Sequence, residues 1–282
     1  MELEDGTLRQ CYPRGKKAAA AAVGDRVRIS PQGRDEGAIE SVEPRRNLLY
    51  RSDDMRTKQF AANVDLLLIV VAVQPTFSDD LVGRALTGAY SAGIEPAIVL
   101  NKIDLADGLE QARGRLAPLA TQGVPLVETS ALNPERTRRQ LAPLLEGRVS
   151  LLLGQSGMGK STLLNALVPE AGAATRAHSA ALGTGRHTTS STRLYHLPDI
   201  AGDLIDSPGF QAFGLQHLSR GELELGFPEF AEPAAHCRFY NCTHRHEPGC
   251  GVLQAVKDGR IPAARHALYA RILAENEAGQ RY

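Results

Sequence analysis

The sequence contains no tryptophan, and aromatic residues make up only 5% of its 282 residues. It also has no excess of charge, because 32 Lys and Arg balance 32 Asp and Glu. A globally basic protein that binds nucleic acid by charge alone is therefore excluded. No apolar run approaches the roughly 18 residues of a membrane span. The longest run, 66–73, has the length of a strand, and with 43% hydrophobic residues the composition is typical of a globular protein.

Signal-peptide features and disulfide patterns are also lacking. The first ten residues include Glu2, Glu4 and Asp5 and contain no apolar core, so we expect a cytoplasmic protein without a membrane partner. There are only four cysteines, and three of them lie between Cys237 and Cys250. This clustering favours a metal site in a reducing compartment over a disulfide framework.

The pattern of apolar residues predicts three domains, at residues 1–57, 58–215 and 216–282. In the first, short runs that alternate apolar and polar residues predict a small β-barrel. In the last, strand patterns stop and residues 263–278 have helical spacing, so we expect a mostly helical domain. The expected barrel strands are 23–29, 38–42 and 48–50.

The middle domain alternates continuously apolar strands with helices, which predicts an α/β sheet covered on both faces. The expected strands are 66–73, 97–100, 125–129, 149–153, 194–197 and 203–206. The expected helices are 79–92, 109–122, 134–145 and 160–167.

A glycine-rich sequence between the strand at 149–153 and the next helix matches the phosphate-loop pattern G-x-x-x-x-G-K-S. Its glycines would let backbone N–H groups surround phosphate oxygens at a helix N-terminus. Lys160 would reach the β- and γ-phosphates and act in catalysis, and Ser161 would bind Mg²⁺. The predicted nucleotide-binding residues here are Gly154, Gln155, Ser156, Gly157, Met158, Gly159, Lys160, Ser161 and Thr162.

An N-K-x-D sequence after the strand at 97–100 indicates which base is bound. The Asp104 carboxylate could accept hydrogen bonds from guanine N1–H and the 2-amino group, whereas adenine offers no such pair of donors. Asn101 would support the loop and the other edge of the base, and Lys102 would lie along the ring. A Ser130-Ala131 pair after another strand would add a backbone N–H for the guanine carbonyl. Taken alone, the N-K-x-D sequence or the Ser-Ala pair could equally belong to an ordinary polar turn.

A D-x-x-G sequence from Asp206 to Gly209 ends the last apolar strand. Asp206 would hold Mg²⁺ through water, and the Gly209 N–H would contact the γ-phosphate and contribute to catalysis. In the preceding polar loop, Thr188 could close on Mg²⁺, which makes Ser161, Thr188 and Asp206 the predicted magnesium ligands. An ordinary surface loop is the alternative for Thr188.

The residue after D-x-x-G is Phe210, where many GTPases have a glutamine that orients the attacking water. Phenylalanine cannot form that hydrogen bond, so we expect slow intrinsic hydrolysis. His187 is the internal candidate for orienting the water, since imidazole exchanges protons near neutral pH. A group from an RNA or protein partner is the alternative.

Near the C-terminus, the spacing C-x4-C-x-H-x5-C predicts a closed site of three thiolates and one imidazole, typical of structural zinc. His236 and His246 are competing imidazoles, and three reduced cysteines without metal are the other alternative. The predicted ligands of the single Zn²⁺ are Cys237, Cys242, His244 and Cys250.

The motifs resemble those of translation-factor-related GTPases in a changed order, because N-K-x-D and Ser-Ala precede the phosphate loop. This order indicates a circular permutation. With the barrel and the Cys3His cluster, the chain resembles the small-subunit-dependent GTPase family RsgA, also called YjeQ or YloQ. The sequences that carry the resemblance are 154–161, 185–189, 206–210 and 246–250.

The resemblance implies an N-terminal OB-fold that contacts 16S ribosomal RNA. It also implies a GTPase that acts late in 30S subunit maturation and is stimulated by the subunit. Our first hypothesis is that such a GTPase hydrolyses GTP to time its release, and we expect it to use Mg²⁺ with GTP and to be a monomer. A nucleotide-controlled RNA-binding scaffold with incidental hydrolysis is the second hypothesis.

Basic residues near the N-terminus fit a groove that follows a phosphate backbone, although a solvated charged face is the alternative. Aromatic residues for base stacking are scarce, with only Tyr12 and Tyr50 in the first 57 residues. The basic residues are Arg9, Arg14, Lys16, Lys17, Arg26 and Arg28.

Overall fold

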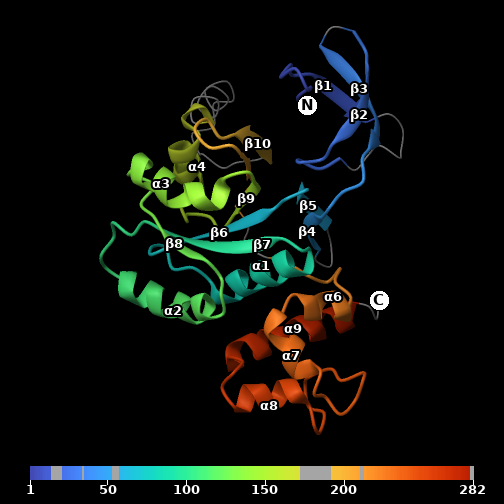
Figure 1. The fold of residues 1–282 in the computed structure, drawn as a ribbon, viewed down its shortest axis with the longest axis vertical. Coiled ribbons are helices and arrows are strands. Elements are labelled where there is room, and N and C mark those ends of the chain that lie inside the picture. Colours follow the sequence, from blue (N-terminus) through green and yellow to red (C-terminus); the bar gives the residue numbers. More distant parts are fainter. Residues whose placement is uncertain (14–20, 34, 53–56, 172–191, 210–212, 280–282) are drawn as a thin grey trace.

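The structure is a computed structural model, and Figure 1 shows its fold. It describes residues 1–13, 21–33, 35–52, 57–171, 192–209 and 213–279.

A six-stranded sheet forms the centre of the molecule, in the order β10-β11-β9-β6-β7-β8. Only β10 is antiparallel to its neighbour, and all seven residues of β6 are buried. Strands this uniformly apolar require helices on both faces of the sheet. The six predicted strands are confirmed, with bounds β6 (Leu66–Ala72), β7 (Glu95–Asn101), β8 (Leu126–Glu128), β9 (Val149–Leu153), β10 (Arg193–His196) and β11 (Asp203–Asp206).

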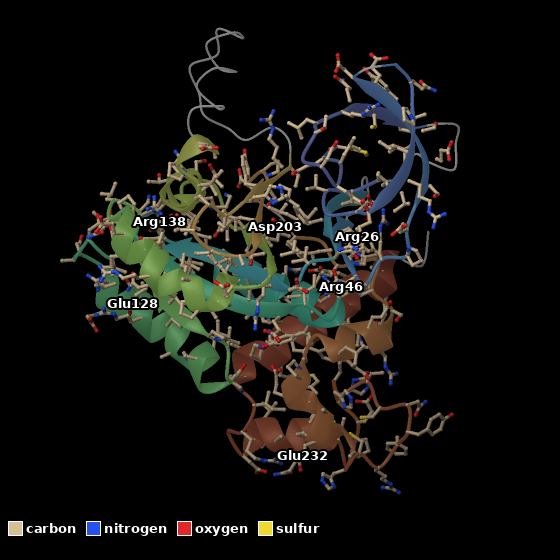
Figure 2. The ribbon with its side chains drawn as sticks, turned by 45° about the horizontal axis from the view of Figure 1, so that its top comes forward. Arg26, Arg46, Glu128, Arg138, Asp203 and Glu232 are labelled. Carbon is tan, nitrogen blue, oxygen red and sulfur yellow. The ribbon has the colours of Figure 1, made fainter. Side chains whose placement is uncertain are left out.

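Four helices cover this sheet, with α3 and α4 on one face and α1 and α2 on the other (Figure 1). The Ser78 hydroxyl accepts a hydrogen bond from Leu81 N at the start of α1, which is a typical N-cap. On the opposite face, Arg138 of α3 donates to the Ala166 carbonyl of α4 at 2.7 Å (Figure 2). The predicted helices are confirmed as α1 (Asp79–Ser91), α2 (Leu109–Thr121), α3 (Pro134–Leu145) and α4 (Lys160–Leu167).

The N-terminal part consists of strands, as predicted, which form the sheet β1-β3-β2 and the pair β4-β5 within the described residues. The predicted strand 23–29 is wrong at its start. Gly24 has φ +92 and lies in a turn, where a methyl group would come within 2.1 Å of the Ala62 carbonyl oxygen. Two strands, β1 and β5, were not predicted. The bounds are β1 (Gln10–Pro13), β2 (Val27–Pro31), β3 (Glu36–Val42), β4 (Leu48–Ser52) and β5 (Thr57–Ala62).

Because β5 begins at Thr57 and pairs with β4, the expected domain boundary falls at the first residue of a strand. The division into three domains stays a prediction.

Residues 213–279 form helices and loops, and α9 packs beside α1 (Figure 1). Among the described residues, no helix combines the length and the apolar character needed to cross a membrane. The helices are α6 (Arg220–Leu225), the 3-10 helix η2 (Pro228–Phe230), α7 (Ala231–Ala234), α8 (Gly251–Lys257) and α9 (Ala263–Gly279).

Candidate nucleotide site and metal centre

The predicted nucleotide motifs meet at one edge of the central sheet. Asn101 is the last residue of β7, Asp206 is the last residue of β11, and the phosphate loop follows β9 directly. These strands run parallel, so their carboxyl ends lie together. The order of the motifs along the chain therefore does not prevent them from forming one site.

The backbone of the phosphate loop passes too close to its neighbours for side chains at its glycines. A methyl group on Gly154 would lie 2.4 Å from the Val70 carbonyl oxygen. Gly157 and Gly159 have φ of +84 and +86, a region that other residues rarely adopt. Gly159 is also the N-cap residue of α4, so the loop ends at a helix N-terminus whose dipole favours anions.

Lys160 is nearly buried, with 9% of its surface exposed, and its ammonium lies inside the loop. Nζ donates to the carbonyl oxygens of Gly154 at 2.8 Å and Gln155 at 3.1 Å. Burial lowers the pKa of Lys160, and the charge of the nearby Asp206 opposes this shift. A desolvated ammonium of this kind gains strongly from an added anion, which is what a phosphate group supplies.

The D-x-x-G segment lies directly against this lysine. A methyl group on Gly209 would be 3.1 Å from Lys160 Nζ and 3.4 Å from Ser156 N. Asp206 is 3% exposed and Ser207 donates to the Leu152 carbonyl at 2.8 Å, which fixes the segment to β9. Gly209 is thus placed where its backbone could meet a terminal phosphate.

Asn101 connects three motifs from a buried position. Its amide nitrogen donates to the Met158 carbonyl of the phosphate loop, and its oxygen accepts from Ala131 N, both at 3.1 Å. Thr129 adds a longer contact of 3.4 Å to the same oxygen. Both ends of the amide are therefore engaged in holding loops, which supports a positioning role.

The other two N-K-x-D residues lie at the rim. Lys102 Nζ donates to the carbonyls of Gln74 and Gly157, each at 2.8 Å, so its stem bridges two loops. Asp104 is exposed, and the Ser130 hydroxyl donates to its carboxylate. This carboxylate is accessible to the edge of a base, as guanine recognition would require.

His187, Thr188 and Phe210 lie outside the described residues. Ser161 and Thr162 are exposed in the first turn of α4. The magnesium set of Ser161, Thr188 and Asp206 and the catalytic role of His187 therefore stay predictions, as do the individual nucleotide contacts.

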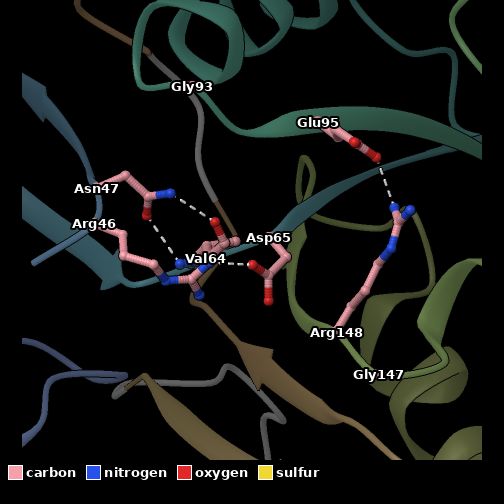
Figure 3. Close-up of a pocket in the computed structure, with 8 residues that line it drawn as sticks. All are labelled: Arg46, Asn47, Val64, Asp65, Gly93, Glu95, Gly147 and Arg148. Atoms are coloured by element: carbon pink, nitrogen blue, oxygen red, sulfur yellow. Dashed lines mark hydrogen bonds and ion pairs between the residues drawn. The ribbon is translucent and has the colours of Figure 1, made fainter.

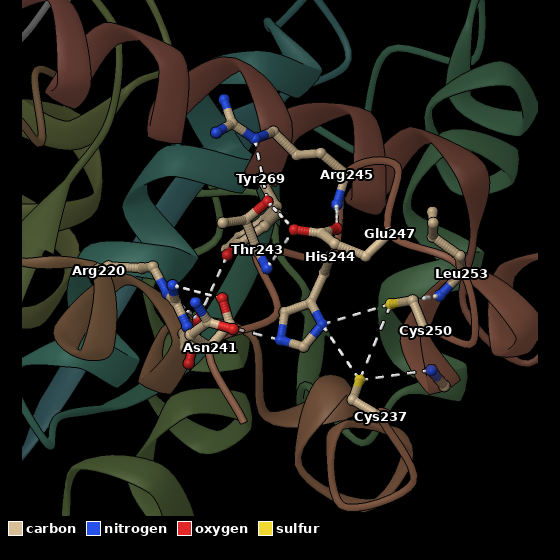
Figure 4. A network of polar contacts seen from close by, with 12 residues as sticks. Arg220, Cys237, Asn241, Thr243, His244, Arg245, Glu247, Cys250, Leu253 and Tyr269 are labelled. Carbon is tan, nitrogen blue, oxygen red and sulfur yellow. Dashed lines mark hydrogen bonds and ion pairs between the residues drawn. The ribbon is translucent and has the colours of Figure 1, made fainter. Parts of the chain in front are cut away.

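The four predicted metal ligands come together in the C-terminal part, with their ligand atoms all within 4.8 Å of one another. Figure 4 shows three of them, Cys237, His244 and Cys250. Zinc–sulfur bonds of about 2.3 Å in a tetrahedron put two sulfur atoms about 3.8 Å apart. The Cys237 and Cys250 Sγ atoms are 3.9 Å apart, and His244 Nδ1 lies 3.6 and 3.4 Å from them. These spacings fit a tetrahedral metal ion.

Local backbone geometry builds this cluster. His244 has φ +59, which turns its ring inward, whereas His236 is exposed and pairs with Glu232 at 3.2 Å. Cys250 caps α8 by accepting from Leu253 N at 3.4 Å, and Gly251 N donates to Cys237 Sγ at the same distance. Such N–H contacts stabilise thiolates, so the donor set is suited to a cation.

Titration of the ligands agrees with a metal site. Burial lowers the pKa of His244, which favours the neutral imidazole that metal binding requires. Burial raises the pKa of Cys242 and Cys250, so metal binding would displace protons from these thiols. On the outer side, His244 Nε2 lies 3.9 Å from a Glu224 carboxylate oxygen, which is too far for a hydrogen bond but leaves a negative charge beside the ring. The sequence pattern did not indicate Glu224, because it lies on α6, well before the cluster.

One hollow at the opposite ends of the strands lies outside both sites (Figure 3). Two ion pairs line it: Arg46 with Asp65 at 2.6 Å and Arg148 with Glu95 at 2.7 Å. Asn47 also exchanges two hydrogen bonds with the Val64 backbone. Its charges are paired with one another, and the Arg46 and Asn47 contacts connect the segment before β4 to the start of β6.

Two solved structures resemble the whole fold. YjeQ from Thermotoga maritima is 33% identical with a TM-score of 0.73, covering 97% of this chain and 91% of that one. YloQ, described as a circularly permuted GTPase, is 28% identical with a TM-score of 0.71, covering 98% of this chain and 88% of that one.

Curated relatives agree with these structures. The protein from Bordetella pertussis named small ribosomal subunit biogenesis GTPase RsgA is 71% identical over 282 residues, which is all of this chain and 94% of that protein. Its namesake from Burkholderia pseudomallei is 57% identical over 273 residues, covering 96% of this chain and 86% of that protein. The profile of the RsgA GTPase family matches residues 42–216. The fold class and the GTP hydrolase class predicted from the sequence are confirmed, and the chain belongs to the RsgA GTPase family.

Proposed function

We propose that this GTPase acts in the biogenesis of the small ribosomal subunit, binds 16S rRNA within the immature 30S particle, and hydrolyses GTP to time its release. The observation that carries the nucleotide part is Asn101, whose buried amide joins the phosphate loop to the Ala131 backbone of the base-recognition loop. The ribosomal part rests on the names of the relatives.

In this proposal, specific residues bind the base and the phosphate groups of the nucleotide. Asp104 would accept the guanine donors, and Lys160 would stabilise charge that develops on the β- and γ-phosphates. Ser161 and Asp206 would hold Mg²⁺, which neutralises phosphate charge when bound. Gly209, beside Lys160, would report the presence of the third phosphate through its N–H.

We also propose that the metal ion at the Cys3His cluster is Zn²⁺ and that its role is structural. Three sulfurs and one nitrogen complete a tetrahedron and leave no ligand position for water. The cluster is mostly buried, which further separates it from any substrate.

The N-terminal strands are our candidate for the RNA contact. Arg26, just before β2, is exposed (Figure 2). Arg28 on β2 is also exposed, although its Nε lies 3.5 Å from a Glu43 carboxylate oxygen. Tyr50 is not free for base stacking, since the centroid of its ring lies 3.9 Å from the centroid of the His217 ring. Tyr12 is 50% exposed and is the better stacking candidate. Arg14, Lys16 and Lys17 lie outside the described residues. A cytoplasmic monomer stays a prediction.

Turnover of GTP with and without purified 30S subunits tests the proposal. We expect slow hydrolysis alone, strong stimulation by 30S subunits, and loss of both in Lys160→Ala. Turnover that 30S subunits leave unchanged, combined with GTP-dependent 30S binding, would instead support the RNA-binding scaffold.

A further inference from the structure

The side chain of Gln155 joins the phosphate loop to the beginning of α1. Its amide oxygen accepts a hydrogen bond from Ser78 N at 2.8 Å, and Ser78 caps α1. Its backbone carbonyl accepts from Lys160 Nζ at 3.1 Å. Gln155 is therefore held by the phosphate-binding lysine through its backbone and by α1 through its side chain.

A second contact holds the same stretch of chain. Lys102 Nζ donates to the Gln74 carbonyl, just before α1, and to the Gly157 carbonyl in the phosphate loop. The connection from β6 to α1 is thus bonded to the phosphate loop at two points. A change in the conformation of the phosphate loop can therefore reach the start of α1 through these hydrogen bonds.

The other side of α1 is fixed to α9 by ion pairs. Arg84 is mostly buried, with 11% of its side chain exposed, and donates two hydrogen bonds to Glu275, at 2.8 and 2.6 Å. It also donates to Asp80 at 2.7 Å, and Asp80 receives Arg271 of α9 at 2.6 Å. Paired and partly buried guanidinium groups restrict sliding between two helices more than exposed pairs do.

Helix α1 is closely packed against both α9 and α6. A methyl group on Gly83 would lie 2.5 Å from Leu268 of α9, and one on Gly226 would lie 2.5 Å from Thr87 of α1. Ser91 at the end of α1 donates to the Glu222 carbonyl of α6 at 2.8 Å. Interfaces packed this tightly transmit a shift of one helix to the next instead of absorbing it.

Helix α9 also contacts the loop that carries the metal ligands. His266 Nε2 lies 2.6 Å from the His244 carbonyl oxygen, and Arg245 forms two hydrogen bonds with Glu277, at 3.0 and 2.8 Å. Tyr269 of α9 lies beside His244 (Figure 4). The helix that receives α1 is therefore also the helix that supports the ligand loop.

We propose that Gln155 is a positioning residue that couples occupancy of the phosphate loop to the metal-binding C-terminal segment through α1. Phosphate groups add a new partner to Lys160, which alters its hold on the Gln155 carbonyl. The Gln155 side chain passes this change to Ser78, and α1 carries it to α6 and α9. The inference rests on the proposed guanine-nucleotide site.

Hydrogen exchange of the full-length protein with and without saturating GDP tests the coupling. In the parent, GDP should slow exchange both in α4 and in α9, by about fivefold in α9, near the lower end of typical coupling factors. Gln155→Leu, which removes the acceptor, should lose the slowing in α9 even when GDP is raised until the variant, whatever its affinity, is saturated. Gln155→Glu, which keeps an acceptor for Ser78 N, should retain the α9 response.

Two variants on α9 provide a matched pair. Glu275→Gln weakens the contact with α1 and should remove the GDP response of α9. Glu277→Gln weakens a comparable pair within the C-terminal segment, so it should raise exchange in both states and leave their ratio unchanged. An α9 response that is absent in the parent, or that survives in Gln155→Leu, would overturn the coupling. Failure of the parent to bind GDP, measured separately, would count against the proposed nucleotide site.

Discussion

Gly159→Ala places a methyl group where the base-recognition loop meets the phosphate loop. Gly159 has φ +86, and the added carbon would lie 2.4 Å from Asn101 Nδ2, well inside contact distance. Asn101 is 1% exposed and has little room to retreat, so its hydrogen bond to the Met158 carbonyl must break.

Two effects add to the cost of this substitution. Left-handed backbone costs a non-glycine residue about 1–2 kcal/mol. Losing the Asn101 hydrogen bond and leaving a buried carbonyl without it costs about 1–2 kcal/mol more. We therefore expect the free energy of unfolding to fall by about 2–4 kcal/mol. Because Asn101 also holds Ala131 N, GDP affinity should fall roughly tenfold, the equivalent of about 1.4 kcal/mol.

Gly123→Ala is the matched control, because Gly123 has φ +85 but no atom within 4 Å of the added methyl group. It should show only the backbone cost, with unchanged GDP affinity. Urea unfolding and titration with a fluorescent GDP analogue measure both quantities. If the two variants lose equal stability and bind GDP equally well, the close contact between Gly159 and Asn101 does not limit the site, and the reasoning is refuted.

Three further substitutions test other parts of the molecule. Asp104→Asn should shift preference from GTP towards XTP, since an amide can donate to the xanthine carbonyl, and competition binding that still favours GTP would contradict this base assignment. Cys250→Ser should release zinc and loosen the C-terminal segment, whereas Cys11→Ser should retain one zinc per chain, as elemental analysis would show. Gly209→Ala, with its methyl group 3.1 Å from Lys160 Nζ, should weaken binding of a non-hydrolysable GTP analogue more than binding of GDP. Equal losses for the two nucleotides would exclude Gly209 as a sensor of the third phosphate.

Features encoded by neighbouring residues were predictable from the sequence. The phosphate loop was recognisable because its glycines, its lysine and the flanking strand and helix are contiguous. The buried strand β6 and the helix α1 followed from apolar runs and helical spacing over short windows. Strand β5 was not predicted, because its residues do not alternate between apolar and polar and its pairing with β4 cannot be read from the sequence.

The sequence pattern alone could not decide which histidine belongs to the metal site. Spacing allowed His236, His244 or His246, but of these three it is His244, with a φ of +59, whose ring nitrogen lies against Cys237 and Cys250. His236 instead pairs with Glu232 on the surface, and His246 is exposed. The spacing of residues along the chain constrains which side chains can meet, but the path of the backbone selects among them.

Contacts between distant residues were decided by the folded chain. Asn101 meets Met158 across 57 residues, Gln155 meets Ser78 across 77, and Arg84 meets Glu275 across 191. Motif order along the chain therefore says little about these neighbours. Parallel strands bring their carboxyl ends to one edge whatever their order. The close packing of α1 against α9 depends on Gly83, and the need for a glycine there is visible only when both helices are in place. Chemistry carried by contiguous residues can be recognised in the sequence, whereas the coupling between those residues arises from tertiary packing.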